Sequence, residues 1–154
     1  MDLVDRKILA ILQQDAALPV AEIASRVGLS QTPCWRRIQR MEAAGTILRR
    51  VVLLDPDAIG LGLTVFVEIQ TGDHSDEWLL RFARLVTDLP EVMEVYRMAG
   101  EVDYLLRIAI TNMAAYDEFY RKLIAMLPLK NVTSRFAMER VKYTTAFPVP
   151  MPAK

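Results

Sequence analysis

Large apolar side chains recur every three or four residues along the first 45 residues of the chain. This spacing predicts three helices, over residues 3–14, 20–27 and 31–44. Asp2 precedes the first helix and Asp5 stands three positions later, which is the spacing of a capping box, while Gly28 supplies the flexible backbone needed after the second helix. The N-terminal part is therefore expected to be a small helical domain.

The third predicted helix follows Ser30, which stands at its N-cap position. Cys34, Ile38 and Met41 recur on one side of this helix and should form its buried stripe. A short helix, a glycine-containing turn and a longer arginine-rich helix are typical of a helix-turn-helix, whose second helix enters the major groove of DNA. Residues 46–55 then have the composition of a strand, which would form a wing.

The pattern changes after residue 62, where strand-like and helical segments follow one another. We expect strand, helix, strand, strand, helix and strand over residues 63–70, 76–89, 92–99, 104–110, 114–127 and 132–145. This order is that of a ferredoxin-like βαββαβ domain. The expected fold class is therefore α+β, with a winged helix-turn-helix domain (1–54), a linker containing proline and glycine (55–62) and a C-terminal ferredoxin-like domain (63–154).

The sheet of a ferredoxin-like domain has one face covered by both helices and one face without a cover in the same chain. Alternating apolar residues on that second face call for a partner, and a second copy of the chain is the simplest one. The sequence therefore predicts a homo-oligomer. The final residues, 147–154, are rich in proline and are expected to be extended and disordered.

The distribution of charge and of cysteine narrows the possible functions. The net charge is zero, but residues 1–50 hold eight basic and five acidic side chains, so contact with a polyanion is expected there. Cys34 is the only cysteine, which excludes an intrachain disulfide and argues for a core role rather than a redox switch. No signal peptide and no apolar run of roughly 20 residues are found, so a cytoplasmic protein is expected.

Four stretches of the chain resemble the Lrp/AsnC, or feast/famine, family of transcription regulators. They are LVDRKILAILQQD, VAEIASRVGLSQTPCWRRIQRMEAAGTI, DPDAIG and GEVDYLLRI, and together they extend the resemblance over essentially the whole length. The resemblance implies a DNA-binding head and a ferredoxin-like domain that binds an effector and assembles the protein. It also implies a homodimer that associates further, as an octamer.

The outward side of the third predicted helix has residues suited to reading DNA. Placed at about 100° per residue from Cys34, the side chains that point away from the buried stripe are those of Thr32, Trp35, Arg36, Gln39 and Arg40. Arginine can fork onto guanine and glutamine onto adenine, while Thr and Trp offer apolar contacts. Ser30 and Gln31 would contact phosphates. The alternative is a charged helix face that contacts only solvent.

Arg37 lies on the flank of this helix face, and its role is left open by the sequence. It would bind a DNA phosphate or an acidic neighbour such as Glu22 or Glu42. These two possibilities predict different partners for the same guanidinium.

The resemblance places the effector site at the turn before the predicted strand 104–110. It implies effector contacts from Met98, Gly100, Asp103 and Tyr104, completed by Thr133 and Ser134. Asp103 would pair with an ammonium group, and a buried Glu101 would disfavour acidic ligands, so leucine or another neutral amino acid is favoured. The alternative is a tight turn in which Asp103 accepts hydrogen bonds from local backbone amides.

Two other classes of function are considered beside a regulator. Some decarboxylases that act on haem precursors share this architecture, but the one histidine, His74, stands in a polar loop where a solvated or capping role is expected. No metal-ligand cluster, phosphate-binding loop or catalytic nucleophile is found, so no enzyme activity, metal or cofactor is expected. An assembly protein without DNA binding would need an uncharged third helix, whereas this one has three arginines.

Overall fold

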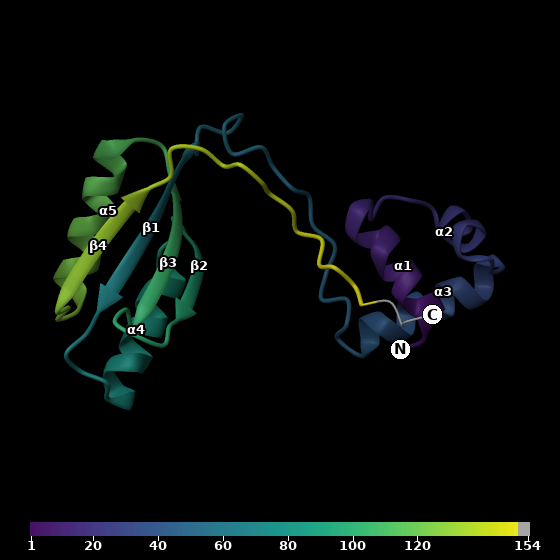
Figure 1. The fold of residues 1–154 in the computed structure, drawn as a ribbon, viewed down its shortest axis with the longest axis horizontal. Helices are drawn as coiled ribbons and strands as arrows, with labels where there is room; N and C mark the ends of the chain where they lie inside the picture. Colours follow the sequence, from purple (N-terminus) through teal and green to yellow (C-terminus); the bar gives the residue numbers. More distant parts are fainter. Residues whose placement is uncertain (151–154) are drawn as a thin grey trace. The chain divides into compact units, whose positions relative to one another are not determined.

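Three helices make up the N-terminal part of the chain (Figure 1): α1 (Leu3–Gln14), α2 (Val20–Val27) and α3 (Gln31–Ala43). In this computed structural model, which describes residues 1–150, both hydrogen bonds of the capping box at the start of α1 are formed. Each of Asp2 and Asp5 accepts a hydrogen bond from the backbone N–H of the other, at 2.9 and 3.0 Å. Gly28 ends α2 in the left-handed conformation, with a φ of 74°. The three predicted helices are confirmed.

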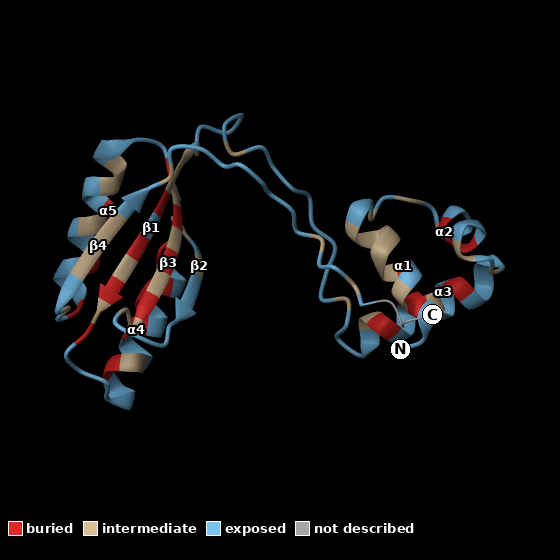
Figure 2. Ribbon diagram, in the orientation of Figure 1, coloured by how far each residue is buried: buried red, intermediate tan, exposed pale blue. Residues whose placement is uncertain are grey.

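The helices enclose a small apolar core. Its buried residues are Ile8, Ile23, Ala24, Cys34, Ile38 and Met41. Figure 2 shows the resulting alternation of buried and exposed positions along α3. The buried stripe predicted for this helix is therefore confirmed. Burial raises the pKa of the Cys34 thiol, which is the environment of an inert core cysteine.

A four-stranded sheet and two helices make up the second part of the chain. Within residues 1–150 its elements are β1 (Leu63–Gln70), α4 (Asp76–Asp88), β2 (Val92–Arg97), β3 (Tyr104–Ile110), α5 (Met113–Met126) and β4 (Asn131–Phe136). Neighbouring strands are antiparallel, in the order β2-β3-β1-β4. The helices α4 and α5 lie on the same face of the sheet (Figure 1), which confirms the predicted ferredoxin-like domain.

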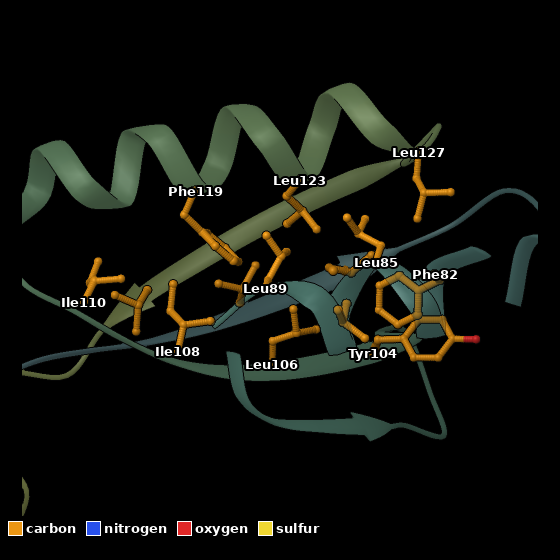
Figure 3. Close-up of a cluster of buried hydrophobic side chains, with 14 of the residues drawn as sticks. Phe82, Leu85, Leu89, Tyr104, Leu106, Ile108, Ile110, Phe119, Leu123 and Leu127 are labelled. Atoms are coloured by element: carbon orange, nitrogen blue, oxygen red, sulfur yellow. The ribbon is translucent and has the colours of Figure 1, made fainter. Parts of the chain in front are cut away.

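Alternate residues of the two central strands point to the helices and form the larger core. On β1 these are Val65, Val67 and Ile69, and on β3 they are Tyr104, Leu106, Ile108 and Ile110. Figure 3 shows Phe119 and Leu123 of α5 above this layer. The intervening residues of both strands therefore point to the opposite face, which neither α4 nor α5 covers.

Two of the predicted strands are absent or shorter than expected. Residues 46–55 contain no strand, because nothing within residues 1–150 pairs with their backbone in a ladder, so the predicted wing strand is wrong. The strand predicted over 132–145 ends at Phe136. Its partner β1 starts at Leu63, so the Ala137 N–H can still reach the Thr64 carbonyl, at 3.0 Å, but later residues have no ladder partner.

Residues 141–150 belong to the N-terminal part of the structure. The chain divides into two compact units: one contains Met1–Val52 together with residues 141–150, and the other contains Leu53–Arg140. The Gln13 side chain donates to the Phe147 carbonyl (3.1 Å) and accepts from its N–H (2.7 Å). This segment was expected in the C-terminal domain, over 63–154. Disorder was predicted for residues 147–154, but Phe147 is hydrogen-bonded to Gln13, and residues 151–154 lie outside the described residues.

Candidate DNA-binding and effector sites

The outward side of α3 is accessible along its length. Ser30, Gln31 and the five residues predicted to face DNA are all exposed: Thr32, Trp35, Arg36, Gln39 and Arg40. Trp35 is the exposed apolar residue of the set, with 51% of its surface accessible. Exposed arginine, glutamine, threonine and tryptophan on one helix can make forked hydrogen bonds and apolar contacts to base edges.

Two of these side chains differ in local structure from the sequence expectation. Ser30 stands at the N-cap position of α3, but its side chain makes no capping hydrogen bond. Gln39 donates from Nε2 to Glu42, at 2.8 Å, and Glu42 also accepts from Arg50, at 3.2 Å. The Gln39 amide is therefore engaged by a residue of its own helix.

Arg37 has acidic partners on α1. Its Nη1 donates to Asp2 at 2.5 Å and to Asp5 at 2.8 Å. The acidic partners expected from the sequence, Glu22 and Glu42, do not contact it, because Glu22 pairs with Arg26 and Glu42 with Arg50. That part of the prediction is wrong.

The charges around Asp2 and Asp5 stabilise both carboxylates. The Asp5 backbone N–H and the Arg37 guanidinium lower the pKa of Asp2 to about 2. Burial by itself raises the pKa of Asp5, but hydrogen bonds from the Asp2 backbone and from Arg37 outweigh it, so this pKa also lies below its ordinary value. The same two carboxylates raise the pKa of Arg37. Both acids are therefore ionised at neutral pH.

Arg40 shares Asp5 with Arg37. Its Nη2 donates to Asp5 Oδ2 at 2.8 Å, although 62% of the Arg40 side chain is exposed. Asp5 itself is 1% exposed. The sequence pattern indicates only the capping-box role of Asp5, because its arginine partners lie 32 and 35 positions away along the chain.

The turn between β2 and β3 is held by Asp103. Its carbonyl accepts from the Met98 N–H at 2.8 Å, and its own N–H donates to the Ile69 carbonyl at 3.0 Å. Its carboxylate Oδ2 accepts from the Thr71 N–H at 2.8 Å. Gly100, in this turn, has a φ of 121°, a conformation that favours glycine. Met98, Gly100 and Asp103 are thus close together.

The other three effector candidates lie on different sides of the sheet. Tyr104 is buried on the helix-covered face, with its ring centroid 4.4 Å from that of Phe82. Ser134 accepts a hydrogen bond from Tyr116 of α5 on the same face. Thr133 pairs with Glu68 in the ladder and points to the open face. The six candidates therefore do not line one common cavity within a single chain.

The residues flanking the turn differ in part from expectation. Glu101 is exposed rather than buried, and its carbonyl accepts from Gln70, at 2.9 Å, so the argument against acidic ligands that depended on its burial does not apply. His74 lies in an exposed loop, as predicted, with Nδ1 4.0 Å from Asp103 Oδ1. The capping role at the start of α4 falls to Ser75, which accepts from the Trp78 N–H.

A groove of about 490 Å³ lies between α4 and the edge strand β2. It is lined mainly by apolar side chains, including those of Leu79, Phe82, Val86, Val92 and Val95. Tyr104 is the one effector candidate that borders it. No pattern in the sequence indicates this groove, since its width depends on the distance between β2 and α4 in the folded structure.

Two further features are absent from the described part of the chain. In residues 1–150, no group of three or more His, Cys, Asp and Glu side chains is placed to hold a metal ion. Over the same residues, no helix combines the length and apolar character needed to cross a membrane.

Both parts of the chain match known families. Residues 1–42 match the AsnC-type helix-turn-helix domain, and residues 64–147 match the Lrp/AsnC ligand binding domain. Among curated proteins, the chain is 52% identical over 150 residues to the DNA-binding transcriptional activator DecR of Escherichia coli K12, covering 97% of this chain and 99% of that protein.

Solved structures give the same assignment. An AsnC family transcriptional regulator from Agrobacterium tumefaciens is 57% identical, with a TM-score of 0.93, covering 96% of this chain and 97% of that one. A transcriptional regulator from Neisseria meningitidis in complex with L-methionine is 34% identical, with a TM-score of 0.91 and 96% of each chain covered. These relatives are regulators rather than enzymes, as the sequence analysis expects. The chain belongs to the Lrp/AsnC family of DNA-binding transcription regulators.

Proposed function

We propose that this protein regulates transcription by inserting α3 into the major groove of its operator. The observation that carries the proposal is the exposure of Thr32, Trp35, Arg36, Gln39 and Arg40 on the side of α3 opposite its buried stripe. Arg36 and Arg40 supply forked donors for guanine, and Gln39 supplies the donor and acceptor that adenine requires. Ser30 and Gln31, at the helix start, contact phosphates and fix the position of α3.

Arg37 has a different role in this proposal. Its guanidinium is 27% exposed and contacts two carboxylates of α1, so it holds α3 to α1. DNA contact through its remaining N–H groups adds to affinity without selecting a sequence.

The proposed effector is a neutral amino acid whose ammonium group pairs with Asp103. Oδ2 of Asp103 accepts from the Thr71 N–H, while Oδ1 lies 4.0 Å from Nδ1 of His74. The L-methionine complex of the Neisseria meningitidis relative supports this ligand class. Met98 and Gly100 would line the same site, with Tyr104, Thr133 and Ser134 shaping the strands beside it. No other cofactor is proposed.

Assembly is proposed to occur through the open face of the sheet. Phe66 of β1 is 36% exposed there, and Leu105 and Ala109 of β3 are partly exposed beside it. A second copy would cover these apolar side chains. We propose a cytoplasmic homodimer that places two α3 helices in successive major-groove segments, and further association up to an octamer. An amino acid regulates this system only if it binds one assembly state better than another.

Selection of bound sequences from a random DNA pool, with and without a mixture of amino acids, tests the proposal. The expected result is enrichment of a partly palindromic site whose affinity changes with amino acids. In the follow-up, Arg36→Ala lowers affinity for that site by about tenfold or more, whereas Arg121→Ala, at an exposed arginine of α5, leaves it unchanged. Weak binding that enriches no sequence would refute the proposal.

A further inference from the structure

We propose that Asp5 of α1 sets how selectively the protein reads DNA, because it holds the guanidinium of Arg40 on α3. This inference rests on the proposed role of α3 in base contact. The Asp5 carboxylate is buried beneath α3 and therefore acts on DNA only through its partners. Asp5 is thus a positioning residue rather than a DNA contact.

The hydrogen bonds of Asp5 occupy both of its carboxylate oxygens. Oδ1 accepts from Arg37 at 2.8 Å, while Oδ2 accepts from the Asp2 N–H at 3.0 Å and from Arg40 at 2.8 Å. Because Asp2 also accepts from Arg37, the two acids and two arginines form one closed network. Of the two arginines in this network, Arg40 is the exposed one, with 62% of its side chain accessible against 27% for Arg37.

Holding Arg40 in this way changes what its guanidinium can do. One Nη donor contacts Asp5, and the remaining N–H donors of the planar group stay available on the exposed side. A side chain that is already fixed loses less rotational freedom when it forks onto a base. The nearby carboxylate also cancels part of the charge that would attract any phosphate. Both effects favour the correct base pair over unspecific DNA.

The test compares two duplexes: one carries the site that the full-length protein enriches from a random pool, and the other is a scrambled duplex of the same composition. Asp5→Asn is expected to weaken binding to the enriched site by about tenfold, while binding to the scrambled duplex stays equal or becomes tighter. Asp15→Asn makes the same charge change at the end of α1, away from α3, and should leave the ratio of the two affinities unchanged.

A second measurement separates positioning from simple loss of structure. In an Arg40→Ala background, Asp5→Asn should no longer change the ratio of the two affinities, because the residue through which it acts is gone. Equal weakening of both duplexes by Asp5→Asn, or an effect on the ratio that persists without Arg40, would overturn the inference.

Where Asp5→Asn does not fold, Arg40→Lys replaces it. Lysine keeps the charge next to Asp5 but lacks the planar fork, so a loss of discrimination of similar size is expected. Unchanged discrimination in Arg40→Lys would overturn the inference. If the unmodified protein enriches no sequence, the proposed function fails. If it enriches a site but the variants keep the same ratio of affinities for the enriched and scrambled duplexes, only the role of Asp5 fails.

Discussion

Asp5 and Asp103 are two aspartates with carboxylates held inside their units, and they differ in how completely they are satisfied. Asp5 is buried and uses both oxygens, accepting from two arginines and one backbone N–H. Asp103 is half-buried and uses one oxygen for the Thr71 N–H, while its other oxygen lies 4.0 Å from His74. A saturated carboxylate has no capacity left for a ligand, whereas a half-saturated one has. The first fixes a neighbouring helix, and the second is suited to a ligand ammonium group.

Removal of the saturated carboxylate should have the largest effect on stability. Asp5→Ala leaves Arg37 without one of its partners and the Asp2 N–H without its acceptor, so we expect a loss of about 2–3 kcal/mol in the helical unit. Denaturant titration followed by tryptophan fluorescence measures this loss in a Trp78→Phe background, where Trp35 of α3 reports the helical unit. In a Trp35→Phe background the buried Trp78 reports the other unit, and its transition should be unchanged; an equal shift of both transitions would contradict the expectation.

Acid should reproduce part of that loss. The pKa values of Asp2 and Asp5 are lowered by folding, so the ionised forms stabilise the folded state. This contribution is complete above the ordinary aspartate pKa of about 3.9 and is lost as the pH falls toward about 2. The melting temperature of the helical unit is therefore expected to fall between pH 4 and 2, roughly. In an Asp2→Asn, Asp5→Asn double variant the same interval should be flatter, and an equally steep fall would exclude these groups.

The half-saturated carboxylate should matter more for ligand response than for stability. Asp103→Ala removes the acceptor of the Thr71 N–H, so the free energy of unfolding should fall by about 1 kcal/mol. The same variant should lose the rise in melting temperature that a bound amino acid produces in the unmodified protein. Thermal scans with and without L-methionine measure both quantities, and a retained shift would place the ligand elsewhere, for example in the groove beside β2.

Removal of a carboxylate from an exposed ion pair should change the free energy of unfolding least. It gives the value against which the effect of the buried Asp5 is judged. Glu22 and Arg26 pair one turn apart on α2, with about half of each side chain in solvent. Glu22→Gln should therefore change the free energy of unfolding by less than about 0.5 kcal/mol. A loss as large as that of Asp5→Ala in the same denaturant titration would show that burial does not separate the two carboxylates.

Local sequence patterns were sufficient for most of the fold. Apolar residues alternate along the strand at 63–70 and recur every three or four residues along α3. Each spacing indicates which side of its element is buried, and it can be read from the sequence of that element alone. Residues 46–55 have an equally strand-like composition but no strand, since a ladder also requires a partner backbone. Composition gives strand propensity but does not supply that partner.

The candidate sites were predictable only in part, for a related reason. Exposure of the outward residues of α3 follows from helical geometry around Cys34. The partners of Asp5 and the docking of Phe147 on Gln13 join residues far apart in the chain, so they are properties of the folded structure. The capping-box spacing identified Asp5, yet it accounts for only one of the hydrogen bonds that Asp5 accepts.

Because Phe147 packs on Gln13, the ferredoxin-like domain is inserted, along the chain, between two segments of the helical unit. The helical unit is assembled from both ends of the chain, and Leu53–Arg140 lies between its two pieces. A fragment that stops at Val52 therefore lacks part of its own unit, and its Gln13 loses both backbone partners. A variant that removes residues 141–150 should likewise destabilise the helical unit, because Phe147 no longer holds the Gln13 side chain of α1.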